Sequence, residues 1–349
     1  MKFRNSKQTI NYLALLLVLF LSLNLNISCE KGTDPEQLKP GRRDYVWTED
    51  TLDIQLPNML TFRHIVGNSP DDIWVGTLDA SYDVSLWHYD GNKWETVFFP
   101  GYATSALWLF EDNTLLVGTL ENKIWKRENG EWTEPYILEL EGFDRINIFD
   151  FYAETKNNIY AVGCAVNLTD NNYKSIILHF DGNSWDFVNI PEIAGVFHQM
   201  EFDKNSNLFF IYGTSDERGN FIESIYTFNG LETVKTTIPD IGFSLSAINK
   251  EIYINFSNQK IYKYRNNSFE LWKDFSGTDF QTSFEGRNES DFFNNSSRGL
   301  GHYNGIDYKT IYETHLELQA RIVFEKEIFV LADDYDKRKY IVLHGKLKE

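Results

Sequence analysis

The chain has 349 residues, with 51 acidic against 33 basic side chains and a formal net charge of −18 at pH 7. Such a charge excludes a typical nucleic-acid binder, because phosphate backbones repel it. The two cysteines, Cys29 and Cys164, exclude a disulfide framework and a thiolate zinc cluster, while 42% hydrophobic residues suffice for a large core.

The N-terminal segment has the layout of an export signal. Three basic residues precede an apolar run over residues 13–23, which is too short for a membrane span of about 20 residues. The serine directly before Cys29 makes this site resemble the lipobox of bacterial lipoproteins, which implies a signal peptide over 1–28 and acylation of Cys29. The alternative is an ordinary secretory signal with an incidental cysteine.

Residues 29–43 contain two prolines and no apolar periodicity, which predicts a flexible tether. The acidic chain that remains after cleavage repels anionic headgroups, so we expect membrane attachment through the lipid anchor only. The expected location is the outer membrane of a cell envelope, on its periplasmic side or at the cell surface.

One sequence unit then recurs along the chain. Each copy has two strand-like runs, a tight turn and a further strand, as in DDIWVGT followed by SLWHYDGNKWETV. The copies cover residues 69–97, 113–134, 157–188, 207–234, 251–272, 291–311 and 327–349. A repeat length of about 44 residues suits a four-stranded propeller blade.

Glycine or asparagine marks the turn of every copy, because a tight hairpin needs a residue that accepts positive φ. The predicted turn residues are Gly91, Gly130, Gly182, Gly230, Gly305 and Gly345, with Asn266 and Asn267 in the remaining copy. The last copy ends too early for a fourth strand, and the segment around Trp47 resembles a fourth strand that has no hairpin before it. We therefore predict an all-β domain over 44–349, a seven-bladed β-propeller of four-stranded antiparallel blades, closed by the N-terminal strand in the last blade.

The phrase DDIWVGT with LWHYDGNKW resembles the propeller repeats in the periplasmic sensor halves of hybrid two-component regulators. It is more loosely similar to kelch and Asp-box propellers. The resemblance implies this architecture and recognition of oligosaccharides. The regulator function does not follow, because the sequence has no kinase or DNA-binding segment.

Catalytic motifs are missing from the sequence: it contains no HExxH, GxSxG, Walker loop or CxxC. His88, His179 and His302 fall at equivalent places in three copies, so they point to structural roles in separate blades. We assign no catalytic residue and no cofactor, and expect a binding module. Weak calcium binding at residues 333–336 or 170–172 stays open.

Long loops between second and third strands, over residues 79–85, 164–174, 214–223 and 333–339, predict walls around one mouth of the channel. Aromatic and polar side chains in them suit a sugar or peptide ligand. The predicted binding residues are Tyr82, Asp83, Asn171, Tyr173, Arg218, Tyr335 and Asp336. Alternatively, the tyrosines only fix the loops.

Further candidates fall near the starts of innermost strands, which line the channel. They are Arg63, His64, Arg145, His198 and Arg321. These residues would serve a glycan hydrolase or lyase, unless each arginine pairs with a carboxylate. The leading hypothesis is a monomeric propeller that binds a glycan or an envelope protein; a scaffold subunit of an envelope complex is the third possibility.

Overall fold

The computed structural model describes residues 40–52, 62–77, 86–101, 103–215, 221–238, 242–337 and 339–349. The predicted signal and most of the predicted tether lie outside this part. So do Cys29, Tyr82, Asp83, Arg218 and the side chain of Arg63. Among the described residues, no helix has the length and apolar composition that a membrane crossing requires.

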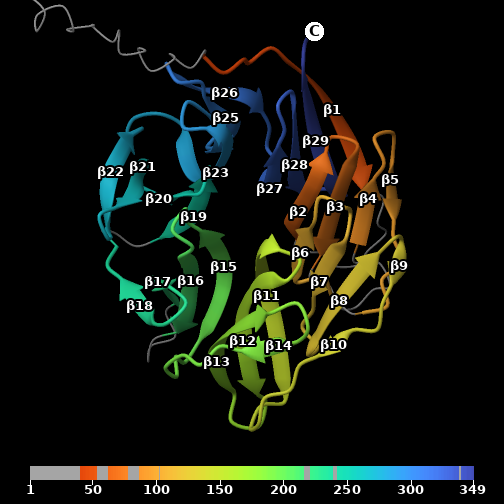
Figure 1. Cartoon of the computed structure of the whole chain (residues 1–349). Helices are drawn as coiled ribbons and strands as arrows, with labels where there is room; N and C mark the ends of the chain where they lie inside the picture. Colours follow the sequence, from red (N-terminus) through yellow and green to blue (C-terminus); the bar gives the residue numbers. More distant parts are fainter. Residues whose placement is uncertain are drawn as a thin grey trace, which may run out of the picture. The chain divides into compact units, whose positions relative to one another are not determined.

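The described strands form seven antiparallel sheets arranged in a ring, which confirms the predicted propeller (Figure 1). Each blade runs from an innermost to an outermost strand. Blade 1 contains β2 (Phe62–Ser69), β3 (Asp72–Thr77), β4 (Leu86–Tyr89) and β5 (Trp94–Thr96); blade 2 contains β6 (Ala106–Leu109), β7 (Leu115–Gly118), β8 (Lys123–Glu128), β9 (Glu131–Trp132) and β10 (Tyr136–Ile137). Blade 3 contains β11 (Arg145–Thr155), β12 (Asn158–Asn167), β13 (Asn172–Phe180) and β14 (Trp185–Phe187); blade 4 contains β15 (Val196–Phe202), β16 (Leu208–Ser215), β17 (Phe221–Phe228) and β18 (Thr233–Thr236); blade 5 contains β19 (Phe243–Ile248), β20 (Glu251–Phe256), β21 (Lys260–Arg265) and β22 (Ser268–Asp274). Blade 6 contains β23 (Phe280–Asn288), β24 (Asp291–Ser296), β25 (Gly299–Tyr303) and β26 (Tyr308–Glu313); blade 7 contains β27 (Glu317–Val323), β28 (Glu327–Asp334), β29 (Lys339–Leu347) and β1 (Tyr45–Leu52).

Blade 7 is completed by the N-terminal strand, as the sequence predicts. β1 pairs with β29 over its whole length, from Tyr45 opposite Leu347 to Leu52 opposite Tyr340. The predicted turn at Gly345 is wrong, because β29 continues straight through this residue to pair with β1. A glycine is required there for another reason: a Cβ at Gly345 would lie 2.6 Å from the ring of Trp47.

The other predicted hairpin turns are confirmed by their backbone angles. The five remaining turn glycines have φ between 86° and 98°. Asn266 and Asn267 have φ of 50° and 61°, so two asparagines supply the same left-handed turn in blade 5.

The repeated histidines are structural, and they hold second and third strands together. In each case Nε2 lies 2.7 Å from a side-chain oxygen at or next to the start of the second strand, and the imidazole ring packs on an aromatic ring of that strand. The pairs are His88 with Asp72, His179 with Asn158, His302 with Asp291 and His344 with Glu327. His344 was not predicted as the fourth member of this set, because a turn expected at Gly345 concealed its equivalence to the other three histidines.

The core lies between neighbouring blades. Trp94 packs against a cluster that joins Val75 of blade 1 to Phe329 and Val342 of blade 7. Trp185 likewise packs on the cluster between blades 2 and 3. Large aromatic side chains at repeated positions therefore hold adjacent sheets together.

The ring has two distinct faces. The link face carries the connections between blades and the turns from second to third strands; the turn face carries the other hairpin turns. On the link face, the predicted long loop of blade 3 is instead an extended hairpin, with Asn167 opposite Asn172. The described part of the chain begins on the turn face, where the Gly41 amide donates to the carbonyl of Asn304 at 3.0 Å.

Candidate functional site

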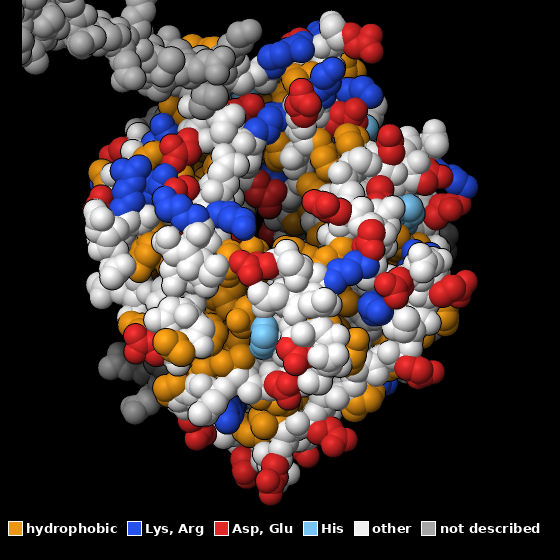
Figure 2. Space-filling view, in the orientation of Figure 1, with side chains coloured by type: hydrophobic (Ala, Val, Ile, Leu, Met, Phe, Trp, Pro, Cys, Tyr) orange, Lys and Arg blue, Asp and Glu red, His pale blue; other side chains and the backbone are white. Residues whose placement is uncertain are grey.

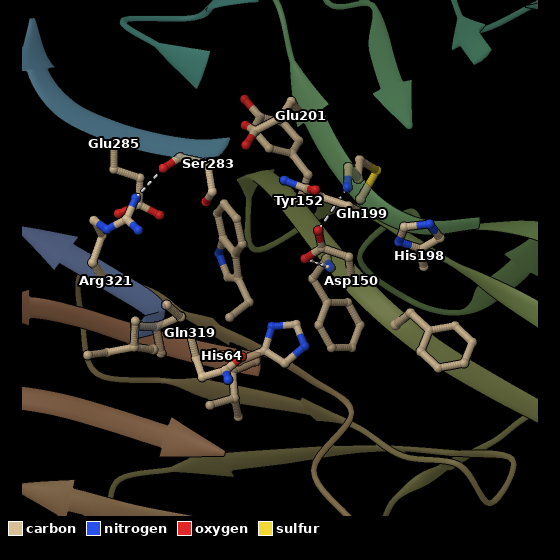
Figure 3. A pocket seen from close by; sticks show the side chains of 18 residues that line it. His64, Asp150, Tyr152, His198, Gln199, Glu201, Ser283, Glu285, Gln319 and Arg321 are labelled. Atoms are coloured by element: carbon tan, nitrogen blue, oxygen red, sulfur yellow. Dashed lines mark hydrogen bonds between the residues drawn. The ribbon is translucent and has the colours of Figure 1, made fainter. Parts of the chain in front are cut away.

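A cavity of about 580 Å³ occupies the centre of the ring, between the innermost strands. A second cavity of about 310 Å³ adjoins it and shares four lining residues, Gln199, Glu201, Ser283 and Glu285. Carboxylates from three blades and one arginine surround this space (Figure 3). Innermost strands place these groups because alternate residues on each such strand face the axis.

Asp150 on β11 is held by two backbone amides. The amide of Phe151 donates to Oδ1 and that of Met200 to Oδ2, both at 2.8 Å. Burial nevertheless raises the pKa of Asp150 to about 7, since the two hydrogen bonds only partly offset the loss of water.

In the described part of the chain, no residue donates a hydrogen bond to Glu201 on β15 or to Glu285 on β23. Burial raises the pKa of Glu201 to about 8, and repulsion from Asp150 and Glu285 adds to this. Desolvation by the surrounding channel walls raises the pKa of Glu285 to about 7, although its side chain is exposed to the channel and the positive charge of Arg321 acts in the opposite direction. Near neutral pH the cavity therefore holds carboxyl groups that are easily protonated and that would gain from a cationic partner.

Arg321 on β27 links blade 7 to blade 6. Its side chain is only 3% exposed. Nη1 donates to the carbonyl of Ser283 at 2.6 Å, and Nη2 donates to Oδ1 of Asn295. Its buried Nε has no hydrogen-bond acceptor in the described part of the chain.

The structure brings together three of the five residues predicted at the channel mouth. His64, His198 and Arg321 line the cavity, and Nε2 of His198 lies 3.6 Å from Oε1 of Glu223. Arg145 does not line it: this residue begins β11 with an exposed side chain.

The described candidates from the long loops lie elsewhere, on the link-face hairpins of blades 3 and 7. Tyr173 and Tyr335 are exposed, as are Asn171 and Asp336, and none of them lines the cavity. They remain predictions for a rim around the channel.

The three cavity carboxylates were not among the residues predicted from the sequence. A signal was present, because each directly follows a large apolar residue inside an innermost strand, as Asp150 does in INIFDFY. With 51 acidic residues in the chain, that pattern could not be separated from ordinary surface carboxylates.

In the acidic segment of blade 7, the side chains that lie close enough to share a metal ion differ from the set predicted at residues 333–336. Ligand atoms of His315, Asp334 and Asp336 lie within 4.8 Å of one another. Asp333 instead accepts a hydrogen bond from Gln319 at 2.9 Å. Lys337 Nζ lies 3.1 Å from Asp334 Oδ2, so a cation is already present beside this cluster.

Comparisons with known proteins show the fold. No family model matches the chain, and no curated protein matches its sequence. Among solved structures, YCF48 bound to a D1 peptide is similar at a TM-score of 0.59 and 13% identity, over 91% of this chain and 100% of that chain.

Two other propellers are similar at comparable levels. A catalytically inactive virginiamycin B lyase from Staphylococcus aureus with quinupristin has a TM-score of 0.56 and 12% identity, over 85% of this chain and 99% of that chain. The WD40 propeller domain of Doa1 has a TM-score of 0.55 and 13% identity, over 88% and 98%. Identities this low establish the architecture alone.

The raised carboxyl pKa values predict how folding stability depends on pH. A carboxyl with a folded pKa near 8 and an unfolded pKa near 4 stabilises the fold below about pH 4, and this contribution is lost as pH rises through 8. We expect Glu201→Gln to match the parent chain in melting temperature at pH 5 and to exceed it at pH 8.5. Thermal unfolding monitored by circular dichroism at both pH values measures the difference. Equal melting temperatures at pH 8.5 would contradict the raised pKa.

Proposed function

We propose that this protein is a non-enzymatic binding module whose central cavity receives a lysine or arginine side chain from a protein partner. The observation that carries the proposal is the pair of channel carboxylates, Glu201 and Glu285, for which no described residue supplies a hydrogen bond. Glu201 is half-buried and Glu285 is exposed to the channel. A carboxylate that the surrounding strands partly shield from water gains from a charge-assisted hydrogen bond, so a cationic side chain would offset its desolvation.

The rest of the lining suits the stem of such a side chain. Trp108 and Tyr152 line the cavity together with the carboxylates, and aromatic rings stabilise both aliphatic stems and cationic heads. A volume of about 580 Å³ lies within the range of ligand sites in proteins. The similarity to a propeller with a bound peptide supports a protein partner.

Residues outside the cavity would also take part in binding and in locating the protein. The exposed rim residues Tyr173 and Tyr335 would contact the partner outside the cavity. A glycan partner remains the alternative for that rim. Acylation of Cys29 would hold the module at a cell envelope, and mass spectrometry of the purified protein tests it by the mass of the N-terminal peptide.

The test uses peptides with one central lysine, arginine or norleucine, measured by fluorescence polarisation. We expect the lysine and arginine peptides to bind and the norleucine peptide to bind at least tenfold more weakly. Because the carboxyl pKa values lie near 7 to 8, binding should weaken as pH falls from 8 to 6.

The matched variants separate the cavity from general surface charge. Glu201→Gln with Glu285→Gln removes both channel charges and should lower affinity at least tenfold. Glu131→Gln at the start of β9, with Glu232→Gln directly before β18, removes two exposed charges and should leave affinity unchanged. Equal binding by the channel variant and the parent would refute the proposal.

A glycan hydrolase or lyase is the second candidate, favoured by one observation. Carboxyl groups with pKa values near neutrality share the cavity with His64 and His198, and groups tuned in this way serve general acid and base catalysis. Turnover of a polysaccharide that is abolished by Glu201→Gln would establish it. Peptide binding without any turnover would favour the binding module.

A further inference from the structure

A third cavity, of about 480 Å³, lies on the turn face between blades 4 and 5, away from the central channel. Hairpin turns of both blades form it. They are the turns over residues 203–207, 249–251 and 265–267. None of its lining residues lines the central cavity, so it is a separate site.

Cationic side chains converge on this cavity in a chain whose net charge is strongly negative. Lys204, Lys250, Lys263 and Arg265 all line it, against two lining carboxylates. Figure 2 shows lysine and arginine side chains gathered over β20, β21 and β22, beside the central hollow. Such local excess of positive charge in an acidic protein indicates an anion site.

The lining carboxylates are already engaged. Glu251 pairs with Lys204 at 2.7 Å and with Lys263 at 3.3 Å. Asp203 accepts hydrogen bonds from the backbone amides of Asn205 and Asn207, at 2.8 and 2.9 Å. These contacts fix two of the lysines and shape the turn.

Lys250 and Arg265 have no carboxylate partner in the described part of the chain. The ammonium of Lys250 lies 5.6 Å from the ring centroid of Phe202. The backbone of Lys250 has a left-handed φ of 61°, so its side chain projects from a tight turn. Arg265 ends β21, directly before the turn at residues 266–267. The nearby Glu289 pairs with Lys263 at 2.5 Å, and the charge of Arg265 contributes to lowering its pKa. Two cations without a direct ion pair among the described residues therefore border one cavity.

We propose that this cavity binds a phosphate-type anion, either a free phosphate or the phosphate headgroup of a lipid. A phosphate group carries one or two negative charges near pH 7 and offers several oxygen acceptors. It therefore accepts from an ammonium and from the planar fork of a guanidinium together. The site lies on the turn face, the face on which Gly41 contacts Asn304.

The experiment has two arms. Isothermal titration with inorganic phosphate and pyrophosphate measures the free anion. Flotation with vesicles of phosphatidylcholine, with and without phosphatidylglycerol, measures the headgroup. We expect binding in at least one arm, with affinity that falls as salt rises from about 50 to 200 mM, as for other phosphate contacts.

Two double variants make the result specific. Lys250→Asn with Arg265→Gln removes the unpaired charges, and asparagine tolerates the left-handed φ at position 250; affinity should fall at least tenfold. Lys93→Ala with Lys309→Ala removes two exposed cations beside other turns of the same face, where each pairs with a carboxylate; affinity should change less than twofold. No binding of any probe by the parent chain, or equal losses in both variants, would overturn the proposal, provided that melting temperatures match.

Discussion

A chain that begins at Asp53 is expected to lose the cooperative unfolding shown by a chain that begins at Pro40, or to melt at least about 10 °C lower. The difference between the two chains is β1. Tyr45 and Leu52 are buried in clusters that join blade 7 to blade 6 and to blade 1, respectively. Burial of such side chains contributes about 1.5–3 kcal/mol each, and loss of the strand also leaves the edge of β29 unpaired.

The total for β1 is thus comparable with the whole stability of a typical domain, about 5–15 kcal/mol. Differential scanning calorimetry of both chains provides the measurement. A synthetic peptide of residues 40–52 should restore the transition when added to the shorter chain, whereas the same peptide with serine at positions 45 and 52 should not. Identical transitions in the two chains would show that β1 does not close the ring.

The fold could be predicted from the sequence because a propeller repeats one local signal. Turn glycines such as Gly91 and Gly182 recur at blade spacing, and each needs only its own hairpin to be recognised. The turn predicted at Gly345 was wrong for a physical reason. In blade 7 the outermost strand comes from the other end of the chain, so the residue that looks like a turn lies inside a continuous strand.

The candidate site was predicted only in part, because it depends on how seven blades face a common axis. Arg321 and His198 were found from their positions near the starts of innermost strands. Arg145 begins such a strand too, yet its side chain is exposed outside the cavity. Glu201 and Glu285 are separated by 84 positions, and only ring closure makes them neighbours across the channel.

The basic cavity on the turn face shows the same dependence. Lys250 and Arg265 are ordinary turn residues in the sequence, and each looks like a solvated surface charge. Three turns from two blades must meet before they border one space. Local patterns therefore predict the blades, whereas the sites depend on contacts between blades.

Replacement of Arg321 by methionine is expected to lower the free energy of unfolding by about 3–5 kcal/mol, because it removes one partner of a buried polar network. Methionine keeps the length of the side chain and its packing but leaves the Ser283 carbonyl and Oδ1 of Asn295 without their donors. The pKa of Glu285 should rise further, since the charge of Arg321 lowers it in the parent chain. Urea unfolding at pH 7 measures the change. Arg145→Met, at an exposed arginine of another innermost strand, should change stability by less than about 0.5 kcal/mol. Equal effects of the two substitutions would mean that Arg321 does not link blades 6 and 7 as the hydrogen bonds indicate.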